Sequence, residues 1–201
     1  MAHLSPLSKN THTDLIEKFN HYQDTRGFIP NSILTMQRRP NIARAFMALN
    51  QAVLYEGTVS EELKMLVSLI ASQASGCRYC QAHMANLSSI YKASSEKISA
   101  VWSWEESELF SDAERAALTL AFKASVIPNE AGHEDFERLK AFFSEDEIVE
   151  IVASISLFGY LNRWNDTMAT DLEDYPKTIA EKVIGSVGWD AGKHDSANHK
   201  T

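Results

Sequence analysis

The sequence predicts an all-α fold, a bundle of helices without a sheet. Apolar residues recur at helical spacing along most of the 201 residues, and no stretch alternates convincingly as a strand does. Only eight glycines and five prolines interrupt this pattern, and 44% of the residues are hydrophobic, enough to bury one substantial core. We therefore expect a single helical domain over residues 14–190, between a flexible N-terminal arm, residues 1–13, and a frayed tail, residues 191–201.

Two helices are expected in the first quarter of the chain. The first covers residues 14–24. Residues 27–31, Gly-Phe-Ile-Pro-Asn, then form a turn, because glycine and proline both interrupt helices. The second helix begins at Pro40, since proline is favoured in the first turn of a helix, and its apolar face extends to Val53.

The third predicted helix is the most regular one, and we expect it at the centre of the fold. It begins near residues 58–60, and its apolar positions follow the i, i+3, i+4, i+7 rule. These positions are Leu63, Leu66, Val67, Ile70, Ala71 and Ala74. Gly76 ends this helix, so Cys77 begins the next one, which runs to about Tyr91.

Capping signals mark the helices of the second half. Residues 111–114, Ser-Asp-Ala-Glu, and residues 144–147, Ser-Glu-Asp-Glu, are both capping boxes that open an apolar helix. The first of these helices ends before Pro128, and the second carries a buried stripe that reaches Asn162. A last short helix is expected over residues 175–184.

Composition and charge restrict the partners and the compartment. Lys and Arg total 19 against 27 Asp and Glu, a net charge of −8, which disfavours binding to a nucleic-acid backbone. No apolar run approaches the roughly 20 residues that span a bilayer, and the first residues lack the pattern of a signal peptide. We therefore expect a cytoplasmic protein with neither a membrane nor a nucleic acid as partner.

The two cysteines of the chain are the strongest functional signal. They are Cys77 and Cys80, and His83 follows one helical turn further on. A cysteine pair at this spacing at the start of a helix can close a disulfide, and the helix N-terminus stabilises a thiolate. In a reducing compartment such a pair is more often catalytic or metal-binding than structural. Thiol redox chemistry is therefore the expected function.

The residue types also indicate a role for each thiol. His83 stands beside Cys80 and can take its proton or, as an imidazolium, hold the thiolate. We therefore assign Cys80 as the nucleophile and Cys77 as the thiol that traps its sulfenic acid as a disulfide. The helix dipole favours the opposite order, as in thioredoxin-like proteins, because Cys77 lies nearer the helix N-terminus.

Other uses of the cysteine pair fit the sequence less well. A zinc site built on Cys77, Cys80 and His83 lacks a third cysteine and needs a distant fourth ligand. Covalent haem attachment needs a histidine where Gln81 stands, and a thioredoxin-like fold needs strands. We therefore expect no metal and no cofactor.

Four blocks of sequence resemble the alkylhydroperoxidase AhpD-like proteins, and more closely the peroxidase-related branch of the carboxymuconolactone decarboxylase-like superfamily. The blocks are residues 27–31, 76–83, 111–118 and 162–164, and the similarity extends over about residues 14–175. The resemblance implies an all-helical bundle in which a helical hairpin carries the Cys-X-X-Cys motif, assembled into trimers or hexamers. It also implies reduction of peroxides by the cysteine pair. The second cysteine then attacks, the first resolves, and a glutamate and a histidine form a proton relay.

The chain departs from this family pattern at both relay positions. The family glutamate usually lies twelve residues before the first cysteine, where this chain has Met65, and methionine cannot accept a proton. Glu61 lies one turn earlier on the same helical face and is therefore the candidate substitute. The family histidine usually lies four residues beyond the second cysteine. His83 lies three beyond Cys80, still on the same face.

We therefore predict a thiol-dependent peroxidase of the alkyl hydroperoxide reductase type, with peroxiredoxin activity, that cycles a disulfide between Cys77 and Cys80. Its predicted site residues are Cys80, Cys77, His83 and Glu61. The expected partners are a peroxide substrate and an external dithiol, a lipoyl group or a thioredoxin-like protein, and the expected assembly is a homo-oligomer. The alternatives are a carboxymuconolactone decarboxylase-like enzyme and a thiol redox sensor that does not turn over.

Overall fold

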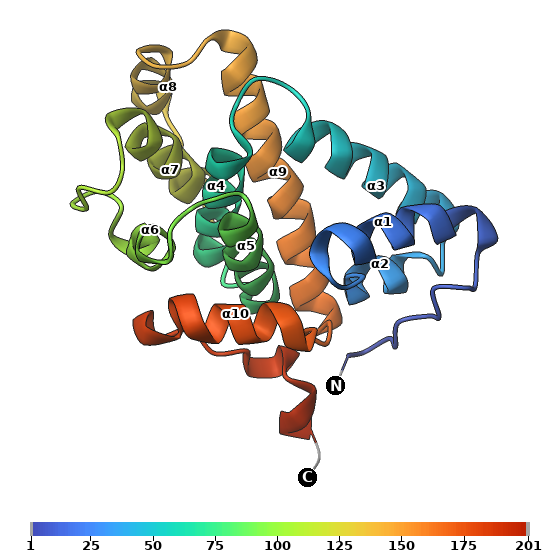
Figure 1. Cartoon of the computed structure of the whole chain (residues 1–201). Helices are drawn as coiled ribbons and strands as arrows, with labels where there is room; N and C mark the ends of the chain where they lie inside the picture. The colour runs from blue at the N-terminus through green and yellow to red at the C-terminus, as the bar shows by residue number, and fades with distance from the viewer. Residues whose placement is uncertain (1, 200–201) are drawn as a thin grey trace.

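The computed structural model describes residues 2–199 and confirms the predicted all-α fold, because every regular element in this range is a helix. In Figure 1, α4 and α5 lie near the middle, the long α9 runs beside them, and α10 crosses below. The α-helices are α1 (Ile16–Arg26), α2 (Asn31–Met36), α3 (Pro40–Tyr55), α4 (Glu61–Ala74), α5 (Arg78–Ile90), α6 (Ser95–Ser99), α7 (Asp112–Ser125), α8 (His133–Lys140), α9 (Glu145–Met168) and α10 (Asp174–Ile184).

Local capping signals explain where several helices begin. Ser111 and Glu114 form the predicted capping box at the start of α7, and Ser144 and Glu147 form the one at the start of α9. Pro40 occupies the first turn of α3, also as predicted. These starts depend on neighbours within three residues, which is why sequence patterns locate them.

Three helices do not follow from the sequence pattern: α2, α6 and α8. They have six, five and eight residues, too few for apolar periodicity to be recognised. Helices this short are unstable alone in water, so their formation depends on tertiary packing. Each buries at least one apolar side chain in the core, Ile33 in α2, Ile98 in α6 and Leu139 in α8.

The centre of the fold is α4, as predicted. Residues 63–72 are buried without interruption, and α4 packs against α5, α7 and α9. Ser68 and Ser72 satisfy their hydroxyl groups inside this core by donating to the carbonyls one turn earlier, those of Lys64 and Ser68. Met65, at the position of the family glutamate, is fully buried. A methionine here is therefore part of the core packing.

Both ends of the described chain are held against the domain. The amide of His3 donates to the carbonyl of Met168, and the amide of Leu172 donates to the carbonyl of His194, whose side chain is itself buried. These hydrogen bonds anchor single points of the predicted arm and tail, whose flexibility stays a prediction, and residues 200–201 of that tail lie outside the described range. The partners in these hydrogen bonds lie far apart in the sequence, so no local pattern predicts the contacts.

A buried ion pair fixes the loop between α3 and α4. The Lys64 ammonium, on a side chain that is 1% exposed, lies 2.8 Å from the Glu150 carboxylate of α9. Burial opposes ionisation of Glu150, but Lys64 and the amides of Thr58 and Val59 donate to it and lower its pKa to about 2. Gly57 has φ +94°, and a Cβ atom there would overlap the Glu150 carboxylate. The loop therefore requires glycine at this position.

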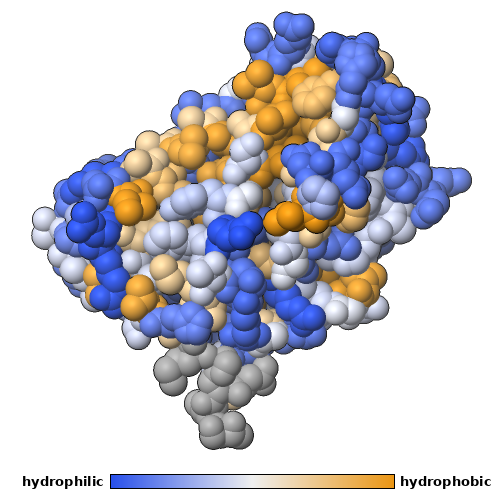
Figure 2. Space-filling view, turned by 180° about the vertical axis from the view of Figure 1, so that it is seen from behind, coloured by the Kyte–Doolittle hydropathy of each residue, from blue (hydrophilic) through white to orange (hydrophobic). Residues whose placement is uncertain are grey.

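Hydrophobic residues gather on one face of the molecule. Seen from behind, they cover much of the upper part of the surface (Figure 2). A shallow depression lined by Phe136, Val149 and Val152 lies where α8 meets the first half of α9, and Val149 is 67% exposed. Within residues 2–199, no helix combines the length and the apolar character needed to cross a bilayer.

The Lys64–Glu150 pair makes a testable contribution to stability. We expect Glu150→Gln to lower the free energy of unfolding at pH 7 by about 3 kcal/mol, because it leaves the Lys64 ammonium buried without a counter-charge. Since the pKa of Glu150 is lowered by folding, its contribution is present above about pH 4.5 and is lost as the pH falls toward 2. Urea denaturation at pH 7 and pH 3.5 measures both effects.

The control is the double variant Lys64→Met/Glu150→Gln, which removes the buried charge as well and is expected to recover part of the loss. A gap between wild type and Glu150→Gln that stays constant from pH 7 to pH 3.5 would contradict the assignment.

Candidate functional site

Both cysteines lie where the chain turns back from α4 into α5. The two helices pack side by side, and only residues 75–77 join them. Gly76 permits this short turn, because its φ of 72° lies in the left-handed region. Cys77 is the N-cap residue of α5 and Cys80 lies in its first turn, and both are buried free thiols. The turn thus places two thiols, one helical turn apart, inside the protein.

The surroundings of Cys80 keep its thiol protonated. Burial raises the pKa of Cys80 well above its usual value, and the adjacent Cys77 raises it further. In the opposite direction, the side-chain amide of Asn165 on α9 donates to Sγ of Cys80 at 3.4 Å and lowers this pKa. The net effect is a thiol that needs a base before it can react as a thiolate.

His83 lines the same cavity as Cys80, and a carboxylate holds its imidazole in place. Nε2 of His83 lies 2.7 Å from Oε2 of Glu173, and the two side chains are only 8% and 11% exposed. In the neutral imidazole, a proton on Nε2 is donated to this carboxylate, and Nδ1 is left as a proton acceptor. The pair follows the logic of a carboxylate that orients a catalytic histidine.

The Glu173 carboxylate accepts two further hydrogen bonds, both at Oε1. One comes from the hydroxyl of Tyr79 at 2.9 Å, and the other comes from the backbone amide of Asn31. Burial, together with the charge of Glu173, raises the pKa of Tyr79 well above 10, so its hydroxyl remains a donor. The Tyr79 ring also stacks on His83, with centroids 4.4 Å apart. Three donors thus fix Glu173, and Glu173 and Tyr79 together fix the imidazole.

The turn at residues 27–31 forms another wall of the site. Phe28 packs edge-on against His83, with ring centroids 5.3 Å apart, and Pro30 is the N-cap residue of α2. Asn31 follows and donates its amide to Glu173, while its side chain donates to the carbonyl of Asp171. This sequence block therefore positions the histidine and its carboxylate, although it contributes no ionisable group.

Cys80 and His83 both line a small cavity. Its volume is about 40 Å³, enough for a few heavy atoms. Most of its other walls are apolar. These include Ile33, Phe46, Leu54, Met84, Leu87, Phe158 and Leu161. Cys77 is not among the lining residues, so Cys80 is the thiol that a small molecule in this cavity meets.

Glu61, the fourth predicted site residue, does not join this cluster. It is the exposed first residue of α4, and its charge acts on Tyr91 just beyond the end of α5. A rise of 1.5 Å per residue puts Tyr91 about 16 Å along α5 from Cys80. The structure brings Cys77, Cys80 and His83 together and leaves Glu61 at the opposite end of the α4–α5 pair.

The sequence pattern does not predict two residues of the site, Glu173 and Asn165. Asn162 lies on the apolar stripe of α9 and is buried, as the pattern predicts. Asn165 lies one turn further on, so extending the same stripe by one turn predicts that it is buried as well. Glu173 is the N-cap residue of α10, and nothing local connects it with His83. Within residues 2–199, no group of three His, Cys, Asp or Glu side chains converges as metal ligands do.

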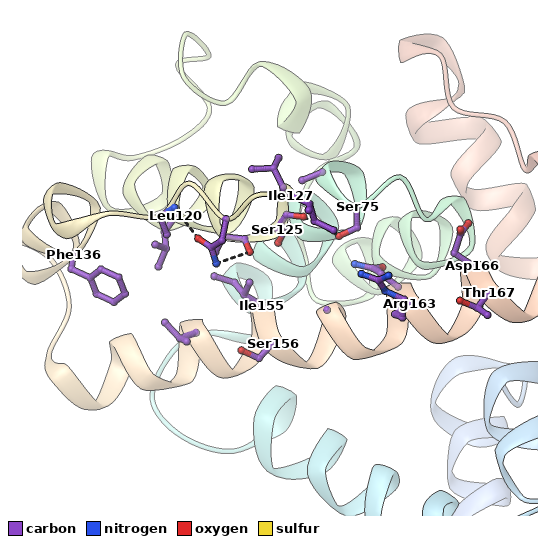
Figure 3. A pocket seen from close by; sticks show the side chains of 18 residues that line it. Ser75, Leu120, Ser125, Ile127, Phe136, Ile155, Ser156, Arg163, Asp166 and Thr167 are labelled. Carbon is purple, nitrogen blue, oxygen red and sulfur yellow. Dashed lines mark hydrogen bonds between the residues drawn. The ribbon is translucent and has the colours of Figure 1, made fainter.

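A larger groove, of about 920 Å³, lies along a different face of α9. Figure 3 shows Ser75, Ser125 and Ile127 on one side of it, and Arg163 and Asp166 on α9 across from them. Neither cysteine lines this groove, and neither does His83. Both Cys80 and His83 therefore lie at the smaller cavity rather than in this larger groove.

Two kinds of similarity connect the chain with known proteins: a sequence match in its middle part and a structural match over most of its length. The model of the carboxymuconolactone decarboxylase family matches residues 40–123. The uncharacterized protein YnjA of Escherichia coli is 35% identical over 106 residues, which are 53% of this chain. The match covers 58% of YnjA, so this chain spans little more than half the length of that curated relative.

Solved structures extend the similarity to nearly the whole chain. The debrominase Bmp8 is 32% identical, with a TM-score of 0.84 that covers 90% of this chain and 97% of Bmp8. A cysteine-to-alanine variant of Bmp8 in complex with 2,3,4-tribromopyrrole gives a TM-score of 0.85. An uncharacterized peroxidase-related protein of Ralstonia eutropha with an AhpD core is 25% identical, with a TM-score of 0.75 over 86% of this chain and 94% of its own.

The contact between Asn165 and Cys80 can be tested by thiol titration. We expect Asn165→Ala to lower the thiolate fraction of Cys80 about fivefold at a pH below its pKa, because a hydrogen bond to the thiolate is lost. The absorbance of the thiolate near 240 nm, referenced to the same variant carrying Cys80→Ser, measures this fraction. Asn162→Ala is the matched control, since Asn162 donates to the carbonyl of Ala71 instead. An equal effect of the two variants would contradict a direct role of Asn165.

Proposed function

Because the chain belongs to the AhpD-like, carboxymuconolactone decarboxylase-like superfamily, we propose that it is an enzyme that reduces peroxides with Cys77 and Cys80. The observation that carries this proposal is the placement of the thiols. Cys80 shares a cavity with His83, and Cys77 lies one turn behind it outside the cavity wall. This is the order of a nucleophile and a resolving thiol.

In the first step Cys80 attacks a peroxide whose O–O group lies in the cavity. His83 accepts the thiol proton at Nδ1, and the thiolate sulfur attacks the terminal OH oxygen of ROOH, so that an S–O bond forms as the O–O bond breaks and the alkoxide RO− is displaced. The alkoxide leaving group takes the proton back from His83 and departs as ROH. Cys80 is then a sulfenic acid, oxidised by two electrons, and the peroxide is reduced by the same two.

In the second step the Cys77 thiol closes the cycle. Its sulfur attacks Sγ of Cys80, the S–OH bond breaks, and hydroxide leaves as water with the proton of Cys77. The product is a disulfide between Cys77 and Cys80, so the net reaction converts ROOH and two thiols into ROH, water and a disulfide. An external dithiol, a lipoyl group or a thioredoxin-like protein, then restores the thiols.

The raised pKa of Cys80 supports a role for His83 as the general base. A buried thiol does not supply a preformed thiolate at neutral pH, so the proton must move during the reaction. Glu173 keeps the proton of the neutral imidazole on Nε2 and stabilises the imidazolium that forms. In this proposal Glu173 takes the part that the sequence assigns to Glu61.

Reductive dehalogenation is the second candidate, and the similarity to a debrominase favours it. The same two thiols balance this reaction. Cys80 takes the bromine from an aryl bromide, the ring carbon gains a proton, and Cys77 then displaces bromide from Cys80 to form the disulfide. The aryl bromide gains two electrons, as the peroxide does. The two candidates therefore differ in the electrophile and share the residues.

The direct test exposes the reduced protein to a small excess of tert-butyl hydroperoxide. We expect both thiols to disappear rapidly with a loss of two mass units, and a sulfenic acid to accumulate in Cys77→Ser but not in Cys80→Ser. Intact mass and free-thiol assays follow both. Accumulation in Cys80→Ser instead would reverse the two roles. Persistence of both thiols for hours would overturn the peroxidase proposal, and 2,3,4-tribromopyrrole is then the electrophile to test.

The relay is tested by comparing two glutamates. We expect Glu173→Gln to slow oxidation of Cys80 about a hundredfold near pH 7, because His83 loses the carboxylate that orients it as a base. Glu61→Gln is the matched control and is expected to stay within twofold of wild type. Stopped-flow oxidation rates from pH 6 to pH 9 measure both, since a lost base also changes the pH profile. The reverse ranking of the two variants would place the relay at Glu61.

A further inference from the structure

A second cavity, of about 600 Å³, adjoins the one that is lined by Cys80. Four residues line both of them and so form the neck between the two. They are Tyr22, Arg26, Asn50 and Leu87. We use "outer groove" for the larger cavity, which is also lined by Tyr55 and Tyr91.

The volumes of the two cavities determine which part of a substrate each of them can hold. The inner cavity, at about 40 Å³, has room for a reacting group of a few heavy atoms and not for an organic molecule. The outer groove has the volume of an ordinary small-molecule site. The remainder of a substrate that reacts with Cys80 therefore lies in the outer groove. The residues of that groove and of the neck then determine which substrates bind.

Arg26 is the charged group at this neck. Its guanidinium lies over the ring of Tyr22, 4.5 Å from the centroid, and over that of Tyr55 at 5.7 Å, and it donates to the Tyr55 hydroxyl. Within residues 2–199, none of the ion pairs includes Arg26. A half-buried cation without a carboxylate partner is well placed to bind an anion.

The other charges of the outer groove lie at its exposed rim. Asp14 is paired with Arg44 at 2.7 Å, and Glu17, Lys18 and His21 are exposed side chains on α1. Exposed charges are screened by water and salt, whereas a charge at the narrow neck is screened less. The electrostatic preference of the site is therefore set mainly by Arg26.

We propose that the outer groove binds an aromatic organic anion, and that Arg26 is the residue that selects it by pairing with its acidic group at the neck. This inference rests on the proposed function, because it assumes that the reacting end of the same molecule reaches Cys80. Two classes of molecule combine an aromatic ring, an anionic group and a reactive group for Cys80. One is an aralkyl hydroperoxide that carries a carboxylate, and the other is a halogenated arene that carries an ionised group.

The tyrosines explain the preference for an aromatic body. Tyr22, Tyr55 and Tyr91 present ring surface to the outer groove, and the rings of Tyr55 and Tyr91 lie 5.9 Å apart. Planar rings stack favourably on such walls and on a guanidinium. Burial raises the pKa of Tyr22 and of Tyr91 to about 12, so both phenols are neutral and do not repel an anion.

The test is an equilibrium binding measurement with a matched pair of unreactive ligands. 4-Isopropylbenzoate and the neutral 4-isopropylbenzamide have similar shape and differ in charge, and isothermal titration calorimetry gives the Kd of each for the reduced protein. We expect the benzoate to bind about tenfold to a hundredfold more tightly than the benzamide. Equal affinities in wild type would overturn the proposal.

Variants at Arg26 make the measurement specific. Arg26→Met is expected to abolish the preference for the benzoate, and Arg26→Lys is expected to retain part of it. Arg26→Gln keeps an amide donor for Tyr55 without the charge, and it replaces the methionine variant if that one does not fold. Arg138→Met is the matched control, because it removes one exposed positive charge on the distant α8. A preference that survives in both neutral variants would overturn the role of Arg26.

Kinetics separates this inference from the proposed function. The hydroperoxide of 4-isopropylbenzoic acid and that of its methyl ester are compared as oxidants of Cys80. We expect kcat/KM to favour the acid in wild type and Arg26→Met to remove this preference mainly through KM. Tight binding of the benzoate without oxidation by either hydroperoxide would refute the peroxidase and leave the anion site standing. Oxidation by the acid and the ester at equal rates, together with equal Kd values for the benzoate and the benzamide, would support the peroxidase and refute the anion site.

Discussion

The organisation of the site depends on one carboxylate, that of Glu173. It stands at the start of α10 and accepts hydrogen bonds from His83 on α5, from Tyr79 on α5 and from the amide of Asn31 at the start of α2. These partners lie 90 or more residues away from it in sequence. A buried carboxylate with this many donors is stable only when all of them are in place. The site is therefore complete only when α2, α5 and α10 have docked together.

Burial of the two thiols has consequences for the chemistry as well as for packing. Burial raises the pKa of Cys80 and so lowers the fraction of thiolate, the form that peroxides oxidise. The serines of α4 close to this turn do not compete for the thiols, because Ser68 and Ser72 already donate to backbone carbonyls. Burial, Cys77 and the charge of Asp166 raise the pKa of Cys80, and the hydrogen bond from Asn165 lowers it.

The extent to which the site could be predicted follows from the range of each interaction. The positions of Cys77, Cys80 and His83 relative to one another depend on one turn of one helix, and a pattern of three residues is enough to predict it. The carboxylate depends on the docking of α10, which no local pattern encodes. Glu61 lies on the helical face that the sequence argument requires, but at the end of α4 that is far from Cys80, and a position along the helix axis is not encoded in a face pattern. Short helices such as α2 were missed for the same reason, since their stability comes from distant contacts.

In the proposed function, the cost of burying charge explains why a small cavity at Cys80 and a larger outer groove with charged residues at its rim divide the substrate between them. An anion inside a 40 Å³ apolar cavity would be desolvated and would also oppose the formation of the Cys80 thiolate. Placed at the neck, the same charge can pair with Arg26 and keep contact with water in the outer groove. In the proposed mechanism only the neutral reacting group then enters the cavity, where His83 exchanges a proton with the sulfur and with the leaving group. This arrangement suits an electrophile whose reactive group is neutral and whose charge lies elsewhere on the molecule. An aralkyl hydroperoxide or a halogenated arene with an ionised substituent has this distribution of charge.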